Sequence, residues 1–165
     1  MSRRQEALRR RYRPAIVRLL FVGEAPPASG RFFYQRDSGL YRAMREAFRA
    51  VDPAVTDDNF LSIFQSHGCY LIDTCPQPVD QLDLRSRRAA CLASEPNLCR
   101  TIKRLQPQAI ATLVRSTFEN VERAALCAGW HGPLIDLPYP GRWLRHREIF
   151  LSALVPHLKT IAREA

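Results

Sequence analysis

One acidic residue stands where an apolar run gives way to a loop near the start of the chain. The segment reads FVGEAPPASGRFFYQRDSGL, in which the run ends at Gly23 and Glu24 follows directly. Glycine allows a tight turn and the two following prolines stiffen the loop, so Glu24 is expected at the mouth of a crevice. A carboxylate in that place suits a general base. The alternative is that Glu24 caps the next segment or pairs with a nearby arginine.

Two later loops offer further polar groups. Asp73 directly follows an apolar run, and a buried acid there needs either a protein donor or a ligand. In the segment LPYPGRWLRHR, rigid prolines flank Tyr139. A basic collar follows it, made of Arg142, Arg145, His146 and Arg147. Arginines and helix N-termini both bind phosphate, although a solvated helix face would explain the later arginines equally well.

Three consecutive aromatic residues, Phe32, Phe33 and Tyr34, fall in the first loop. Aromatic side chains in a loop normally bury against something. A flat ligand such as a nucleobase is one candidate, and the hydrophobic core is the other.

The elements that must position these residues alternate between strands and helices. Apolar runs predict strands over 16–22, 69–72, 109–114 and 134–137. Helices are predicted over 3–12, from Asp37 or Ser38, over 56–65, from Ser94, over 117–128 and over 143–163. This order predicts an α/β fold, a three-layer α/β/α sandwich with a central, mainly parallel four-stranded sheet. Ligands of such sheets bind outside the carboxyl ends of the strands, where the loops described above lie.

Length and composition favour a single domain over 1–165, with a basic N-terminal helix within 1–14. The chain has 165 residues, 46% of them hydrophobic, which is enough for a core. Its 25 basic and 16 acidic residues leave 25 − 16 = +9. Nearly all of the basic residues are arginines, whose planar fork suits phosphate, so a polyanionic partner is expected. An arginine bias inherited from base composition is the alternative.

The sequence shows no membrane-spanning or secretory segment. No apolar run approaches the length of a membrane helix, and the basic start MSRRQEALRRRYRP has no apolar stretch. We therefore expect a cytoplasmic protein that does not contact membranes.

The motif VGEAP, followed by GRFF and SGL, resembles the first motif of the uracil-DNA glycosylase superfamily, particularly of branches with a GEAPG-type sequence. LPYPGR stands where those enzymes carry an HPS-type motif, and YLIDTCP stands where they have a strand ending in Thr-Asn. The resemblance implies a uracil-DNA glycosylase-like fold and a monofunctional DNA N-glycosylase. Such a hydrolase acts in base-excision DNA repair and cleaves the N-glycosidic bond of a flipped, damaged or deaminated base.

The resemblance also implies roles for the first loop. Glu24 matches the residue that activates water, and Phe33 matches the aromatic side chain on which the flipped base stacks. Gly23, Ala25 and Pro26 would shape the loop around the base.

Two positions depart from the family's pattern. Asp73 stands where the family reads the pyrimidine with an asparagine amide, and Tyr139 stands where a histidine donates to the base. An ionised aspartate only accepts hydrogen bonds, so Asp73 suits cytosine-like or purine donors unless it is protonated. Tyr139 would donate a hydrogen bond to the departing base. The arginines at 142, 145 and 147 would contact DNA.

The cysteines predict no metal centre. The five at 69, 75, 91, 99 and 127 contain no C-x-x-C pair. Some similar branches hold a four-iron, four-sulfur cluster through four cysteines, two of them near the amino terminus. This chain has none before Val17, and two ligands, Cys75 and Cys91, do not hold such a cluster. We expect a monomer that binds DNA without a cofactor, metal or iron-sulfur cluster.

Two other functions stay open from the sequence. A catalytically inactive nucleic-acid-binding protein that keeps the glycosylase fold would explain both the positive charge and the missing Asn and His. An α/β enzyme that handles nucleotides or sugar phosphates would also fit the sheet edge.

Overall fold

The computed structural model describes residues 2–141 and 143–163. Four parallel strands form one sheet in the order β2-β1-β3-β4. They are β1 (Leu19–Gly23), β2 (Cys69–Asp73), β3 (Ala109–Thr112) and β4 (Leu134–Asp136). The predicted α/β fold with a four-stranded parallel sheet is therefore confirmed.

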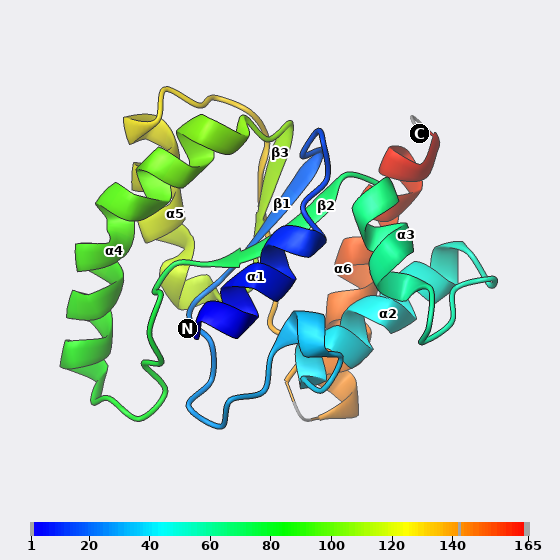
Figure 1. The fold of residues 1–165 in the computed structure, drawn as a ribbon, viewed down its shortest axis with the longest axis horizontal. Helices are drawn as coiled ribbons and strands as arrows, with labels where there is room; N and C mark the ends of the chain where they lie inside the picture. The colour runs from blue at the N-terminus through cyan, green and yellow to red at the C-terminus, as the bar shows by residue number, and fades with distance from the viewer. Residues whose placement is uncertain (1, 142, 164–165) are drawn as a thin grey trace.

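Helices cover the sheet on two sides (Figure 1). On one side lie α4 (Leu84–Leu105) and α5 (Phe118–Cys127), and on the other lie α2 (Gly39–Val51), α3 (Phe60–Ser66) and α6 (Leu144–Arg163). The first helix, α1 (Arg3–Arg11), crosses in front of β1 and β2 in this view. Two short 3-10 turns, η1 (Phe33–Gln35) and η2 (Arg115–Thr117), lie in the loops after β1 and β3.

The apolar run LLFVG becomes the strand that is buried along its whole length. It pairs with β2 on one side and with β3 on the other, and both of its faces are covered. Phe21, for example, stacks on Phe64 of α3 with ring centroids 5.8 Å apart. A strand buried on both faces needs a continuous apolar run rather than an alternating one, which is what this segment supplies.

The prediction that a helix begins at Ser94 is wrong, because α4 begins at Leu84. Asp83 caps it by accepting hydrogen bonds from the backbone amides of Arg85 (2.9 Å) and Ser86 (3.0 Å). Pro96 lies inside the helix instead of in its first turn. Proline removes one backbone hydrogen bond there, but the apolar face continues past it into the core, so the helix is maintained.

The other helix signals agree with the structure to within a few residues. Of the two caps considered for α2, Ser38 is the one used, since its hydroxyl accepts from the Tyr41 amide at 3.1 Å. The helix predicted from residue 56 begins at Phe60. Gly129, with φ +69°, follows α5 in the left-handed conformation that glycine adopts without strain. Pro156 lies within α6, and the helix continues through it.

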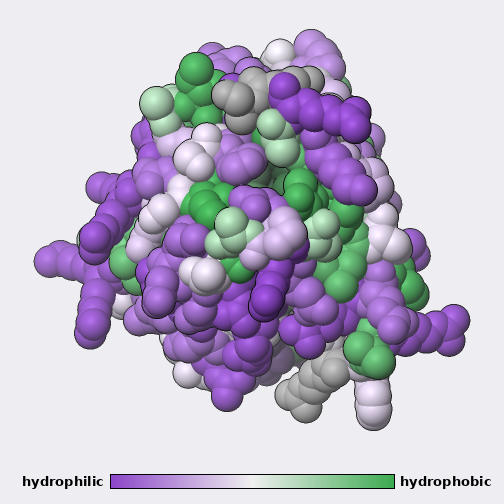
Figure 2. Space-filling model, turned by 90° about the vertical axis from the view of Figure 1, so that its right-hand side faces the viewer, coloured by the Kyte–Doolittle hydropathy of each residue, from purple (hydrophilic) through white to green (hydrophobic). Residues whose placement is uncertain are grey.

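The face viewed in Figure 2 is mainly hydrophilic, with hydrophobic side chains in scattered groups. No helix among the described residues is long and apolar enough to cross a membrane.

Candidate active site

The loops after β1 and β2 are joined by backbone hydrogen bonds. Both the amide and the hydroxyl of Thr74 donate to the Gly23 carbonyl, at 2.9 and 3.0 Å. The Cys75 amide donates to the Glu24 carbonyl at 2.7 Å. Gly23 and Asp73 are also paired in the register of the sheet. These contacts fix the backbone of Glu24 relative to Asp73 at one edge of the sheet.

Gly23 is required by the side chain beside it. A Cβ atom at this position would lie 2.8 Å from Oδ1 of Asp73, closer than real Cβ atoms approach other atoms. Glycine therefore makes room for the Asp73 carboxyl group to lie over the end of β1.

A cavity of about 410 Å³ opens at this edge of the sheet. Its volume falls in the range of pockets that bind small ligands, roughly 300–1,000 Å³. All of the residues predicted to bind the base or to catalyse the reaction line it: Gly23, Glu24, Ala25, Pro26, Phe33, Asp73 and Tyr139. The structure thus brings these residues to one place, while their roles stay predictions.

Glu24 is paired with an arginine, which was one of the alternatives considered for it. Arg87, in the first turn of α4, donates from Nε to Oε1 of Glu24 at 2.6 Å and from Nη2 to Oε2. The Glu24 side chain is 10% exposed. The hydrogen bond to Glu24 raises the pKa of Arg87, so the guanidinium stays charged beside the carboxylate. A two-point contact of this kind fixes the orientation of the carboxylate in the cavity.

Sequence analysis missed Arg87 because it placed the start of this helix at Ser94. Recognition of Asp83 as a helix cap would have placed Arg87 at a helix N-terminus. It would not have identified Glu24 as its partner, which lies 63 positions earlier in the chain.

Asp73 has a perturbed carboxyl group. Burial raises its pKa from 3.8 to about 6, and the positive charge of Arg9 partly opposes that shift. A substantial fraction of Asp73 is therefore protonated in mildly acidic solution. A protonated carboxyl group donates through its hydroxyl and accepts through its carbonyl oxygen, as an asparagine amide does with its own two groups.

The three consecutive aromatic residues are all buried. Phe33 packs edge-on against Tyr34, with ring centroids 5.0 Å apart, and against Phe64 at 5.3 Å. The Tyr34 hydroxyl donates to the Leu71 carbonyl (3.1 Å) and accepts from the Leu71 amide (2.8 Å). Because β2 is the outer strand, these bonds attach the loop to the free edge of the sheet. Core packing thus accounts for all three side chains, and Phe33 lines the cavity as well.

The rim of the cavity carries Tyr139, which is 52% exposed. Partial loss of solvent raises the pKa of its hydroxyl above the ordinary value of 10, so it is a neutral hydrogen-bond donor at physiological pH. Two large hydrophobic side chains follow it at the start of α6, Trp143 (73% exposed) and Leu144 (70%). Sequence analysis passed over this pair, although its position between the arginines of the basic collar was a usable signal.

The arginines predicted to contact DNA differ in their exposure and in their ion pairs. Arg145 is exposed. Arg147 donates from Nε to Oε2 of Glu46 at 2.7 Å, so part of its hydrogen-bonding capacity links α6 to α2. Arg142 lies outside the described residues. The cavity gains one further cation from Arg31, which the sequence did not single out.

Two of the cysteines lie together. The Sγ atoms of Cys75 and Cys91 are 3.5 Å apart and both side chains are buried. Within residues 2–141 and 143–163, no group of three or more His, Cys, Asp or Glu side chains is arranged to hold a metal ion. Two thiols do not fit a cluster that needs four, and the expectation of no metal stays a prediction.

The family described as the uracil DNA glycosylase superfamily matches residues 11–162, which is nearly the whole chain. No curated protein matches the chain at a significant level of similarity.

Proposed function

Because the chain belongs to the uracil DNA glycosylase superfamily, we propose that it hydrolyses the N-glycosidic bond of a flipped, damaged or deaminated base in DNA. The observation that carries this proposal is the single cavity lined by Glu24, Phe33, Asp73 and Tyr139 at the carboxyl ends of the strands. The cavity combines an apolar wall, against which a flat base can stack, with polar groups that can contact the edge of the base. A glycosylase needs both once the base has left the duplex.

In the proposed reaction Glu24 acts on the sugar side. The C1′–N bond lengthens, positive charge develops on the sugar, and the carboxylate stabilises that charge. Water attacks C1′ while Glu24 orients it and accepts its proton. The bond electrons leave with the base, and the Tyr139 hydroxyl donates a hydrogen bond to the developing negative charge. Arg87 is a positioning residue in this scheme, because it acts on the reaction through Glu24.

Asp73 would read the edge of the base. In its protonated form the carboxyl group accepts from N3–H of uracil and donates to O4, which reproduces the pattern of an asparagine amide. In its ionised form it only accepts, and it then suits bases that present amino donors. The pKa of about 6 lets both forms exist near neutral pH.

DNA engagement is proposed from charge and from exposed apolar groups. The net charge of +9 favours a phosphate backbone, and binding should weaken with salt by a slope of about −0.9 per phosphate neutralised on duplex DNA. Trp143 and Leu144, which are exposed and follow the cavity residue Tyr139 by four and five positions, are proposed to fill the space in the duplex that the flipped base leaves.

The test is single-turnover excision by Glu24→Gln. Wild-type protein is first screened against uracil, hypoxanthine, xanthine and alkylated bases in single- and double-stranded DNA. On the best substrate, Glu24→Gln should lower the rate by roughly 10²- to 10⁴-fold, the usual effect of losing a positioned general base. DNA affinity should stay nearly unchanged.

Glu95→Gln is the matched control. Glu95 is also largely buried, at 16% exposure, and it is also paired with an arginine, Arg123, at 2.7 Å, but it does not line the cavity. Its replacement should leave the excision rate nearly unchanged. If both variants lose rate equally, the effect of Glu24→Gln is structural. If wild type releases no base from the panel while it binds DNA, the inactive binding protein replaces this proposal.

A further inference from the structure

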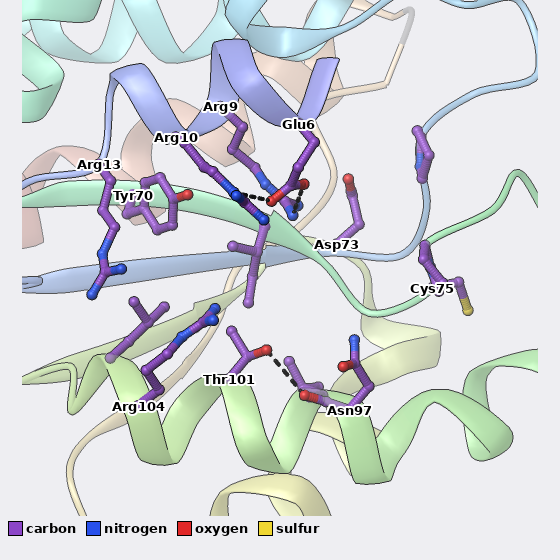
Figure 3. Close-up of a pocket in the computed structure, with 15 residues that line it drawn as sticks. Glu6, Arg9, Arg10, Arg13, Tyr70, Asp73, Cys75, Asn97, Thr101 and Arg104 are labelled. Atoms are coloured by element: carbon purple, nitrogen blue, oxygen red, sulfur yellow. Dashed lines mark hydrogen bonds and ion pairs between the residues drawn. The ribbon is translucent and has the colours of Figure 1, made fainter. Parts of the chain in front are cut away.

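A second cavity of about 300 Å³ lies between α1 and α4, over the outer strand β2 (Figure 3). Its floor is formed by Tyr70 and Ile72. It meets the candidate active site at Pro26 and Asp73, which line both cavities. The other residues that line this second cavity have no part in the function proposed above.

The lining of this cavity is strongly basic. It contains four arginines, Arg9, Arg10, Arg13 and Arg104, against two acids, Glu6 and Asp73. The formal balance is 4 − 2 = +2 with Asp73 ionised, and it is higher when Asp73 is protonated.

One acid is already used by two of these arginines. Glu6 accepts from Nη2 of Arg9 at 2.5 Å and from Nε of Arg10 at 3.0 Å. Arg13 and Arg104 form no ion pair with any described residue. Figure 3 shows their guanidinium groups extending into the space between α1 and α4 from opposite sides. The cavity therefore presents two uncompensated cations.

Hydrogen-bond donors also exceed acceptors here. Nε of Arg9 is buried and has no partner within the described part of the chain. The Tyr70 hydroxyl makes no hydrogen bond to a described residue either. Burial raises the pKa of Tyr70 and the charge of Glu6 adds to the rise, while the charges of Arg9, Arg13 and Arg104 lower it. Buried donors in native proteins almost always have acceptors, so the buried Nε of Arg9 calls for one, and the exposed guanidinium groups of Arg13 and Arg104 that line the same cavity favour an anionic acceptor.

We propose that this cavity binds a small phosphorylated ligand with two or more negative charges, its phosphate held by Arg13, Arg104 and the Tyr70 hydroxyl. Arginine forks match phosphate oxygens in geometry as well as in charge. The cavity volume is at the lower end for small-ligand pockets, which favours a pyrophosphate or nucleotide over a duplex. This binding site does not depend on glycosylase activity.

The test is calorimetric titration of the full chain with inorganic pyrophosphate at constant ionic strength. Arg13→Gln/Arg104→Gln should weaken binding by roughly tenfold or more, because charge-assisted hydrogen bonds are lost at two positions. The control is Arg42→Gln/Arg49→Gln, which removes the same number of charges from exposed positions of α2, on the other side of the sheet from α4 and outside this cavity. It should change the affinity by no more than about twofold, since exposed charges at a distance are largely screened. Arg13 and Arg104 are themselves exposed, so both double variants should fold.

Three outcomes would overturn the proposal. The first is no saturable binding of pyrophosphate by the wild type. The second is an equal loss in both double variants, which would indicate diffuse charge attraction. The third concerns the source of the phosphate. If Arg13→Gln/Arg104→Gln loses affinity for a single-stranded oligonucleotide as strongly as for pyrophosphate, while the control keeps both, the cavity holds the DNA backbone instead.

Discussion

The replacement Asp73→Asn should stabilise the protein at alkaline pH and not at acidic pH. The folded state raises the pKa of Asp73 from 3.8 to about 6 by burial, so it binds this proton more tightly than the unfolded chain does. The stability that comes from proton binding is fully present below pH 3.8. It is lost as the pH rises through about 6, where the folded state must accept a buried charge.

The size of the effect follows from the shift in pKa. About two pKa units at 1.36 kcal/mol per unit give roughly 2–3 kcal/mol lost by the wild type above pH 6. Asparagine has nearly the same shape and carries no charge, so the variant avoids this loss. The variant should therefore be more stable than the wild type by roughly 2–3 kcal/mol near pH 8, and the difference should shrink toward zero near pH 4.

The assay is urea unfolding of both proteins from about pH 4 to about pH 8, because the difference between them isolates Asp73 from other titrating groups. Asp58→Asn is the control, because it makes the same replacement at a side chain that is fully exposed. A difference that is independent of pH would refute the reasoning. So would a variant less stable than the wild type near pH 8, because it would mean that the charged form is the one favoured by the fold.

The remaining predictions concern the same edge of the sheet. Gly23→Ala should cost about 1–3 kcal/mol of stability, because its Cβ would displace the Asp73 carboxyl group; an unchanged urea midpoint would show that Asp73 moves aside freely. Trp143→Ala should slow single-turnover excision from duplex DNA by roughly tenfold and spare single-stranded substrate, which needs no base flipping. Equal losses on both substrates would contradict that role.

The sequence by itself determined the class of fold and the loops that matter. A continuous apolar run such as LLFVG stays buried on both faces of a strand, and the β/α alternation then leaves a parallel sheet as the stable arrangement. The candidate residues Glu24, Asp73 and Tyr139 follow from the same reasoning, since strand ends in such a sheet meet at one edge. These signals depend on short stretches of sequence, so they can be recognised without the three-dimensional structure.

Helix boundaries were harder to predict from the sequence, because several residues have types that favour the start of a helix. Ser94 and Pro96 have the types that begin helices, yet Asp83 begins α4 and the apolar face of the helix continues past the proline. Which residue caps the helix depends on how the whole apolar face of the helix packs against the core, and residue propensities do not describe that packing.

The tertiary structure alone decided the electrostatics of the two cavities. Arg87 reaches Glu24 across 63 positions because α4 packs its first turn against the loop after β1. The raised pKa of Asp73 and the donors around Tyr70 arise in the same way, from α1 and α4 closing over β2. Desolvation and ion pairing depend on which distant segments exclude water from a group. That information exists only once the chain has folded.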